Sequence, residues 1–444
     1  MVDLSPELAT VILGVGLLVA ILLGYPLVFS LGGVALLVGA FSFGPGMAQL
    51  FYSRIIGVVS DYIFLAVPLF VFMGVMIEQS GIAERLFSAF YLWLGGLRGG
   101  LAIVTIIIGT IMAASVGVVT ASVVMIGLLA LPAMVRRGYD RALASGAVCA
   151  GGTLGILIPP SIMLVVYGPT ASISVGKLFM AAFVPGLLLS VLYIAYIAVR
   201  GMMDPSVGPP MPAAERAVPL GKKIRALLVS IVPPLVLILS VLGTIFFGIA
   251  SPTDAAAVGA AVSVLMALGY KALNPQSFKG AVYETMRITG LVMAIAMGGS
   301  MFSGVFLGLG CGQVITDLIL SAPGGAWGSF VIIMVLIYVL GMFIDWIGII
   351  FIMVPIITPI SEALGFDTLW FAMMVIVNLQ MSFLSPPFCP TVFVLHGIVR
   401  KEWGIQMSDI MKGVLPFLGM IAIALFVCVW FPQIILWLPN QMIR

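Results

Sequence analysis

Long apolar runs separated by short polar connections form most of this chain. A helix that crosses a bilayer needs about 20 mostly apolar residues, and several runs have about that length. We predict membrane spans in the first half at residues 9–24, 26–42, 60–78 and 178–199. We predict further spans in the second half at residues 226–249, 254–270, 288–309 and 413–438. Residues 43–57 are less hydrophobic, and we expect them to lie along the membrane interface.

Two further apolar segments carry a helix-breaking sequence in the middle. Residues 141–174 contain Pro159-Pro160 just after a glycine-rich stretch, and residues 368–398 contain Pro386-Pro387 at the matching place in the other half. Irregular backbone at membrane depth is tolerated only where it is buried in protein or lines a watery cavity. Paired interrupted segments of this kind are typical of the binding site of a secondary transporter. We therefore predict two broken helices.

Two further segments are candidate hairpins, and the first of them is too long for one helix. They are residues 97–135, interrupted by small side chains near Ala113 to Gly117, and residues 327–360, interrupted near Phe343 to Gly348. We interpret each as a re-entrant helical hairpin that enters and leaves on the same side of the membrane.

The composition agrees with a membrane protein. Of the 444 residues, 62% are hydrophobic and only 8% are charged, whereas a soluble domain has about 25% charged residues. The four cysteines are scattered singly, so neither a disulfide framework nor a transition-metal site is expected. The basic residues lie in short connections, which gives no indication of nucleic-acid binding. No GxxxxGK[ST] phosphate loop and no nucleophile–base arrangement is present, so we expect no enzyme activity and no cofactor.

The distribution of basic residues predicts the orientation. With the N-terminus outside and each hairpin returning to its own side, all of the 19 Lys and Arg residues except Arg54, Lys177 and Arg444 fall inside. Basic residues are enriched in cytoplasmic connections. Both termini are therefore predicted to be periplasmic.

This topology divides the chain into two similar parts. Residues 1–200 and 226–444 each contain three spans, a hairpin, a broken helix and a final span, and residues 201–225 form a cytoplasmic linker. The first part starts outside and the second starts inside. The predicted fold is an all-α polytopic membrane protein with about ten transmembrane helices plus two re-entrant helical hairpins in an inverted-topology repeat.

Five segments carry a resemblance to a known family. They are VPLFVFMGVMIEQSGIAERLF (67–87), LGGLRGGLAI (94–103), GGTLGILIPPS (151–161), FFGIASPTDAAAVGA (246–260) and GMFIDWIGIIFIMVPIITP (341–359). The chain resembles, over nearly its whole length, the large membrane subunit of TRAP (tripartite ATP-independent periplasmic) transporters, the DctM-like family. GGTLGILIPPS together with ASPTDAAA is the most specific part of the match.

The resemblance implies a function and partners. It implies sodium-coupled uptake of a small organic anion across the bacterial inner membrane by an elevator mechanism, in a fold similar to the ion-transporter superfamily. A periplasmic substrate-binding protein is expected to deliver the substrate. A four-helix small membrane subunit is expected as a separate polypeptide packed against this chain in the lipid bilayer.

The resemblance also implies a first sodium site built mainly from backbone carbonyls. Sodium is a hard cation that prefers oxygen ligands, and unwound membrane helices free such carbonyls. The implied residues are Ala114, Ser115 and Val116 at the first hairpin tip, with Gly155, Ile158 and Pro160 in the first broken helix. The commoner Ser-Gly-Ser tip of the family is Ala-Ser-Val here.

A second implied sodium site lies at the other hairpin. Its residues are Asp345, Trp346, Ile347, Ser382, Ser385 and Pro387. Asp345 is the sole acidic residue between Asp317 and Glu362, and an ionisable residue in such an apolar run is a functional hypothesis by default. The alternative is that Asp345 caps the second arm of the hairpin.

Three hydroxyl residues are candidates for the substrate cavity: Thr120, Thr153 and Ser161. Such hydroxyls also bond to backbone carbonyls within helices, which is the alternative for each. Ser251, followed by Pro252 and Asp254, is predicted as a helix N-cap. The sole histidine, His396, is predicted to be a surface or packing residue.

Two questions about transport stay open at this level. A stand-alone sodium/carboxylate symporter without a binding protein shares the plan of hairpins and broken helices. The sequence does not identify the substrate, although the segments LQMSFLSPPFCPT and MFIDWIG favour a monocarboxylate or 2-oxo acid over sialic acid.

Overall fold

The regular structure of the chain is helical throughout its described part. The computed structural model describes residues 4–442 apart from 118, 213–214, 216–217 and 387–388. Within these residues, eight helices are long and apolar enough to cross a membrane. The prediction of an all-α polytopic membrane protein is thus confirmed, whereas the predicted repeat and its boundaries stay predictions.

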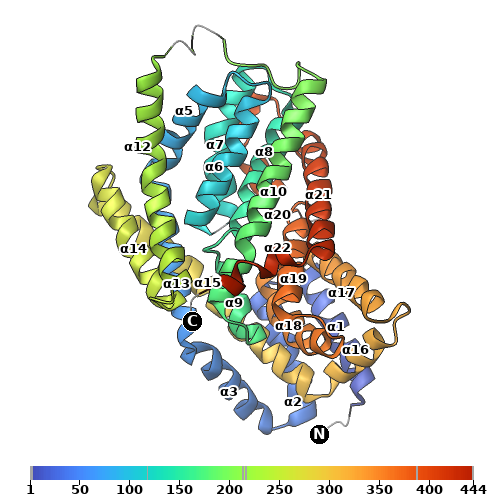
Figure 1. Cartoon of the computed structure of the whole chain (residues 1–444). Coiled ribbons are helices and arrows are strands. Elements are labelled where there is room, and N and C mark those ends of the chain that lie inside the picture. The colour runs from blue at the N-terminus through green and yellow to red at the C-terminus, as the bar shows by residue number, and fades with distance from the viewer. Residues whose placement is uncertain (1–3, 118, 213–214, 216–217, 387–388, 443–444) are drawn as a thin grey trace.

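The first helices extend from the lower end of the molecule, where α1, α2 and α3 lie, to α5 near the upper end (Figure 1). They are α1 (Pro6–Leu22), α2 (Leu27–Phe43), α3 (Gly46–Ser60), the short helix η1 (Tyr62–Leu65), α4 (Ala66–Gln79) and α5 (Ile82–Leu94). Local capping fixes several of their starts. Ser5 accepts a hydrogen bond from the Leu8 N–H ahead of α1, and Asp61 accepts one from the Ile63 N–H ahead of η1.

The segments predicted as hairpins each consist of two antiparallel helices. The first has α6 (Gly100–Val116) and α7 (Val119–Arg136), and the second has α17 (Gly325–Gly341) and α18 (Trp346–Ala363). Gly117 ends α6 with φ 65°, a left-handed conformation that glycine adopts without steric cost. The chain can therefore reverse sharply at the first tip.

The segments predicted as broken helices are interrupted near their proline pairs. The first contains α8 (Arg141–Thr153), the short helix η2 (Leu154–Ile156) and α9 (Ile162–Ala171). The second contains α19 (Thr368–Ser382) and α20 (Pro390–Ile398). Residues 143–153 and 370–380 are buried along their whole length. The leading halves of both broken helices thus form the core of the molecule, and the predicted interruptions are present in the described residues.

The remaining helices surround this core or extend beside it. They are α10 (Val175–Met203), α12 (Leu220–Ile238) with its π-helical continuation (Leu239–Gly243), α13 (Thr244–Phe246), α14 (Pro252–Gly269), α15 (Pro275–Gly308), α16 (Cys311–Leu320), α21 (Met407–Trp430) and α22 (Gln433–Leu436). Two single turns, η4 (Lys401–Trp403) and η5 (Pro439–Gln441), complete the described helices. In Figure 1, α12 and α14 stand apart on one side of the core.

Three features differ from the expected elements. Helices α5 and α16 follow α4 and α15 directly and were not expected as separate helices. Helix α15 begins at Pro275, well before the span expected at 288–309, because Asn274 and Ser277 form a capping box that starts the helix early. The predicted N-cap at Ser251 is confirmed, since its hydroxyl accepts a hydrogen bond from the Asp254 N–H.

Close packing of helices in the core depends on small residues. A Cβ atom on Gly109 of α6 would lie 2.6 Å from the carbonyl oxygen of Gly151 on α8. A Cβ atom on Gly146 of α8 would lie 2.1 Å from the carbonyl oxygen of Gly413 on α21. Small residues let membrane helices approach closely and gain dispersion contacts. Helix α8 therefore packs between α6 and α21 with its backbone in direct contact with the backbones of both helices.

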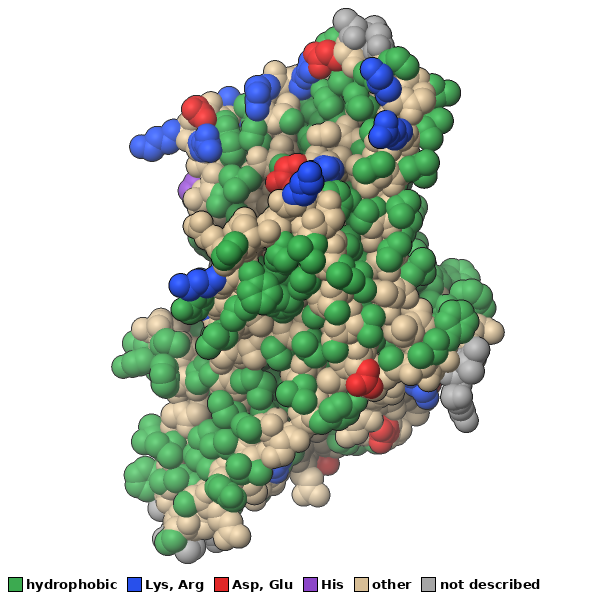
Figure 2. Space-filling model, turned by 90° about the vertical axis from the view of Figure 1, so that its left-hand side faces the viewer, with side chains coloured by type: hydrophobic (Ala, Val, Ile, Leu, Met, Phe, Trp, Pro, Cys, Tyr) green, Lys and Arg blue, Asp and Glu red, His purple; other side chains and the backbone are tan. Residues whose placement is uncertain are grey.

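Basic residues are concentrated near one end of the molecule on the face seen in Figure 2. Figure 2 shows Lys and Arg side chains mostly near the upper end of this face, above a broad hydrophobic surface. In Figure 1 that end holds the α5–α6, α7–α8 and α10–α12 connections. Arg98 and Arg137 lie in the first two of these connections, and Lys222 lies in the first turn of α12.

Candidate functional site: a cavity between the two hairpin tips

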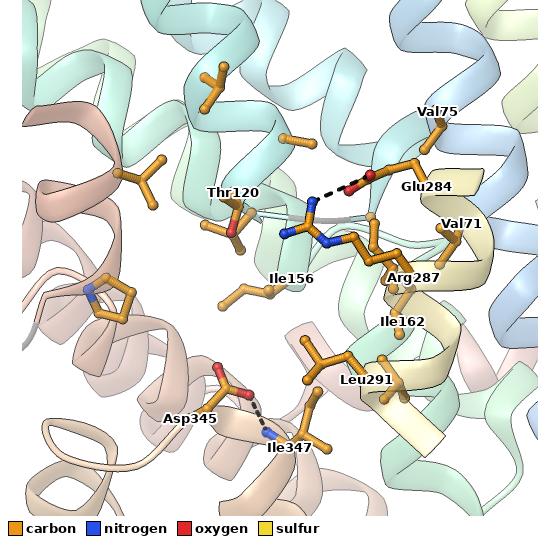
Figure 3. Close-up of a pocket in the computed structure, with 18 of the residues that line it drawn as sticks. Val71, Val75, Thr120, Ile156, Ile162, Glu284, Arg287, Leu291, Asp345 and Ile347 are labelled. Atoms are coloured by element: carbon orange, nitrogen blue, oxygen red, sulfur yellow. Dashed lines mark hydrogen bonds and ion pairs between the residues drawn. The ribbon is translucent and has the colours of Figure 1, made fainter. Parts of the chain in front are cut away.

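A cavity of about 770 Å³ lies between the two hairpin tips and two helices of the surrounding layer (Figure 3). The first tip contributes Gly117 and Thr120, and the second contributes Asp345 to Ile347. The opposite wall comes from α4 and α15. Residues next to both helix breaks, Ile156 and Thr391 among them, also line the cavity. Six segments, several of them far apart in the sequence, therefore meet around one space.

The first hairpin tip packs directly on the first helix break. A Cβ atom on Gly117 would lie 3.3 Å from the Pro160 carbonyl oxygen and 3.7 Å from the Ile162 nitrogen. Ala114, Ser115 and Val116 form the last turn of α6 just before Gly117. The Ser115 hydroxyl donates to the Ile111 carbonyl at 3.3 Å. The predicted residues of the tip and of the break thus lie in adjacent segments.

The first break is fully enclosed by protein. Gly155, Ile158, Pro160 and Ser161 are all buried. The Ser161 hydroxyl donates to the Ile156 carbonyl at 2.7 Å, which ties the two sides of the break together. Pro160 has no N–H to donate, so the backbone here leaves carbonyl oxygens without the usual helical partner.

The second tip presents Asp345 to the cavity. The Asp345 carboxylate accepts a hydrogen bond from the Ile347 N–H at 3.2 Å and forms the N-cap of α18. The side chain is nevertheless exposed, and Figure 3 shows it pointing into the cavity. Trp346 is half-buried and Ile347 is buried, and both line the same space. One carboxylate therefore both starts a helix and offers oxygen atoms to the cavity.

Ser382 and Ser385 lie against the other arm of the second hairpin. A Cβ atom on Gly341 of α17 would lie 2.4 Å from the Ser382 Oγ. The Tyr338 hydroxyl and Ser385 Oγ are 2.9 Å apart and share a hydrogen bond. Both serines also donate to backbone carbonyls of α19. Pro387 lies outside the described residues.

The three substrate-cavity candidates occupy different places. Thr120 is exposed and lines the cavity. Thr153 is fully buried and donates to the Ala150 carbonyl at 2.9 Å. Ser161 is also fully buried, within the first break. Of the three, Thr120 is the one whose side chain reaches the cavity in this conformation.

A buried polar cluster was not expected from the sequence. Tyr193 of α10 interacts with the side chains of Thr153 and Gln380, and all three are fully buried. The Gln380 amide and the Tyr193 hydroxyl make no hydrogen bond of normal geometry. When Pro159-Pro160 is aligned with Pro386-Pro387, Thr153 and Gln380 occupy matching positions of the two broken helices. The alignment of the proline pairs was the signal that could have linked them.

Charged residues on the opposite wall were also missed. Glu78 of α4 and both Glu284 and Arg287 of α15 line the cavity. Arg287 directly precedes the apolar run expected at 288–309, and Glu284 lies one helical turn before it. The distribution of basic residues predicts only that Arg287 lies on the inside. The positions of Glu284 and Arg287 in the sequence did not indicate that their side chains face the hairpin tips.

The side chains around the cavity are of a few chemical kinds. Among the described residues, no group of three or more His, Cys, Asp and Glu side chains is placed to hold a metal ion. The four cysteines are buried free thiols. The exposed His396 lies on α20. The described residues that line the cavity offer carboxylates, hydroxyl groups, one guanidinium and apolar walls.

Comparison with known proteins gives consistent results. The family described as "Tripartite ATP-independent periplasmic transporter, DctM component" matches residues 14–434. The C4-dicarboxylate TRAP transporter large permease protein DctM of Vibrio cholerae is 29% identical, and the alignment covers 97% of this chain and 96% of that protein. The sialic acid TRAP transporter large permease protein SiaM of the same organism is 30% identical, with 94% and 95% covered.

One solved structure supports the fold. The YdaH transporter of Alcanivorax borkumensis superposes with a TM-score of 0.65 over 96% of this chain and 99% of that chain. The two sequences are 14% identical, so this likeness concerns the fold alone.

Proposed function

This chain belongs to the family of DctM components of tripartite ATP-independent periplasmic transporters, and from this premise we propose that it carries out sodium-coupled uptake of a small organic anion across the bacterial inner membrane. Its relatives are transporters named for organic acids. The observation that carries the proposal is the cavity that both hairpin tips and both helix breaks share. Converging broken backbone at membrane depth is how secondary transporters hold ions and substrate.

Two sodium ions are proposed to bind on either side of this cavity. The first would use carbonyls of Ala114, Ser115 and Val116 with Gly155, Ile158 and Pro160, and the contact of Gly117 with Pro160 supports this grouping. The second would use Asp345 and its neighbours Trp346 and Ile347 with Ser382, Ser385 and Pro387. All of these offer carbonyl, hydroxyl or carboxylate oxygens, the ligands that hard cations prefer.

The substrate is proposed to be a carboxylate bound between the tips. Thr120 on the first tip faces the same space as Asp345 on the second, which places a hydroxyl donor beside a candidate sodium site. A sodium ion held there would offset the charge of the carboxylate. Of the carboxylates, a monocarboxylate or 2-oxo acid is our preferred class.

Transport is proposed to follow an elevator mechanism. The hairpins and broken helices would move as one unit along a scaffold that includes α4, α14 and α15. The basic end seen in Figure 2 supports a cytoplasmic upper side and periplasmic termini. The cavity contains Glu78, at the end of α4, and Gly280, near the start of α15, both at the proposed cytoplasmic side. The conformation is therefore interpreted as facing inward.

The experiment that tests this proposal is uptake into proteoliposomes. The chain is reconstituted with a four-helix small subunit and a periplasmic binding protein from its genomic neighbourhood, and a panel of labelled carboxylates is offered with and without a sodium gradient. Uptake is expected to require sodium and the binding protein. Uptake by this chain without the binding protein would favour the stand-alone symporter, and no uptake of any carboxylate would contradict the proposal.

A further inference from the structure

One face of α15 forms a wall of the cavity opposite the hairpin tips. Glu284, Arg287, Leu291 and Ile295 all line the cavity, at the spacing of a single helical stripe. The stripe changes from charged to apolar in the direction of the second tip. The α15 wall that faces the hairpin tips is therefore charged at one end and apolar at the other.

Arg287 is the sole basic residue among the described residues that line this cavity. Its side chain is 81% exposed and points into the cavity in Figure 3. An Arg at the edge of a membrane span that faces a cavity, and not lipid, marks a possible ion or substrate pathway. Its guanidinium has five donors in a planar fork that matches a carboxylate.

The Arg287 guanidinium is only loosely held by its neighbour. Its ion pair with Glu284 is 3.7 Å long, spans one helical turn and is exposed to the cavity. Exposed pairs of this kind contribute little free energy. A second carboxylate that enters the cavity can therefore compete with Glu284 for Arg287.

We propose that Arg287 is a carboxylate-binding residue on the fixed wall, and that the substrate anion exchanges with Glu284 there on its way to the cytoplasm. This inference rests on the proposed function. In the inward-facing conformation the anion leaves the hairpin tips, binds Arg287 in place of Glu284, and is released when Glu284 returns. Glu284 thus keeps the affinity of the wall low enough for release.

The test is equilibrium binding to the purified complex of this chain with the small subunit. The probe is the labelled carboxylate, such as pyruvate or succinate, that the wild-type system takes up with sodium. Arg287→Gln is expected to weaken binding about tenfold, because a hydrogen bond between charged groups is lost. Arg287→Lys is expected to weaken binding less. Glu284→Gln is expected to tighten binding about two- to fivefold, because the competing carboxylate is gone.

The opposite signs of the two changes distinguish this role from a structural ion pair, which would make both substitutions harmful in the same direction. Lys279→Gln is the matched control, since Lys279 is an exposed basic residue of α15 that stacks on Tyr283 and does not line the cavity. Unchanged binding in Arg287→Gln, or weakened binding in both variants, overturns the inference while sodium-dependent uptake by the wild type stands. Loss of wild-type uptake with every carboxylate would instead overturn the proposed function itself.

Discussion

At the scale of single residues, Asp345 caps a helix and also faces the cavity. Its carboxylate caps α18 through the Ile347 N–H, which is the structural interpretation of an Asp before a helix. The same carboxylate is exposed to the cavity, which is what a sodium ligand requires. The helix-cap interpretation and the sodium-ligand interpretation of Asp345 are therefore compatible. They predict different effects when an uncharged capping residue replaces Asp345.

Replacing Asp345 by Asn separates the two roles. Asn is about as good an N-cap as Asp, so the melting temperature should stay close to that of the wild type. The charge is lost, so the sodium concentration for half-maximal uptake should rise about tenfold or more. Asp345→Ala should lose both the cap and the charge. If uptake by Asp345→Asn keeps the sodium dependence of the wild type, Asp345 is a cap alone.

At the scale of elements, the helices of the core are placed by backbone contacts. The α6 arm of the first hairpin meets α8 at Gly109 and Gly151, where a Cβ atom would come within 2.6 Å of a carbonyl oxygen. A flexible side chain could move away, but a helical backbone cannot do so without shifting the whole element. The position of the first tip relative to the first break therefore depends on this contact.

Gly109→Ala is expected to destabilise the protein by about 1–3 kcal/mol, as overpacking in a close-packed core does. Gly14→Ala in α1 is the control, because nothing lies within 4 Å of its Cβ position and the helix propensity changes equally. The measurement is the melting temperature of each purified variant in detergent. A Gly109→Ala protein that melts at the temperature of the control would show that the α6–α8 distance adapts freely.

At the scale of the whole molecule, the arrangement suggests a central unit beside a scaffold. Phe64 of η1 stacks on Phe351 of the second hairpin, with ring centroids 6.4 Å apart, across the proposed boundary. Met73 of α4 and Gly259 of α14 touch within the proposed scaffold. If the unit slides, the first contact must break in each cycle and the second must persist.

Cross-linking across the boundary should therefore stop transport. In a chain whose four native cysteines are replaced by alanine, mercuric ions that link Phe64→Cys to Phe351→Cys should abolish uptake, and excess thiol should restore it. The pair Met73→Cys and Gly259→Cys serves as the control and should transport at the same rate with and without mercury. Continued uptake with the first pair fully linked would exclude the elevator movement.

Features that depend on neighbouring residues could be predicted before the structure was known. Apolar length specified where helices can cross a membrane, because each crossing must bury its own backbone hydrogen bonds. Proline pairs specified where α8–α9 and α19–α20 break, and Ser251 with Pro252 specified the start of α14. These signals lie within a few residues of the structure that they determine.

Which helix faces contact one another could be seen only in the folded protein. No local sequence pattern indicated that Arg287 of α15 faces the hairpin tips. No local pattern indicated that Thr153, Tyr193 and Gln380 lie together in the core. The start of α15 was placed too late for a related reason, since a capping box can extend a helix beyond its apolar run. Such features depend on the packing of segments distant in sequence, where side-chain volume and close backbone approach select one arrangement among many with the same hydrophobic pattern.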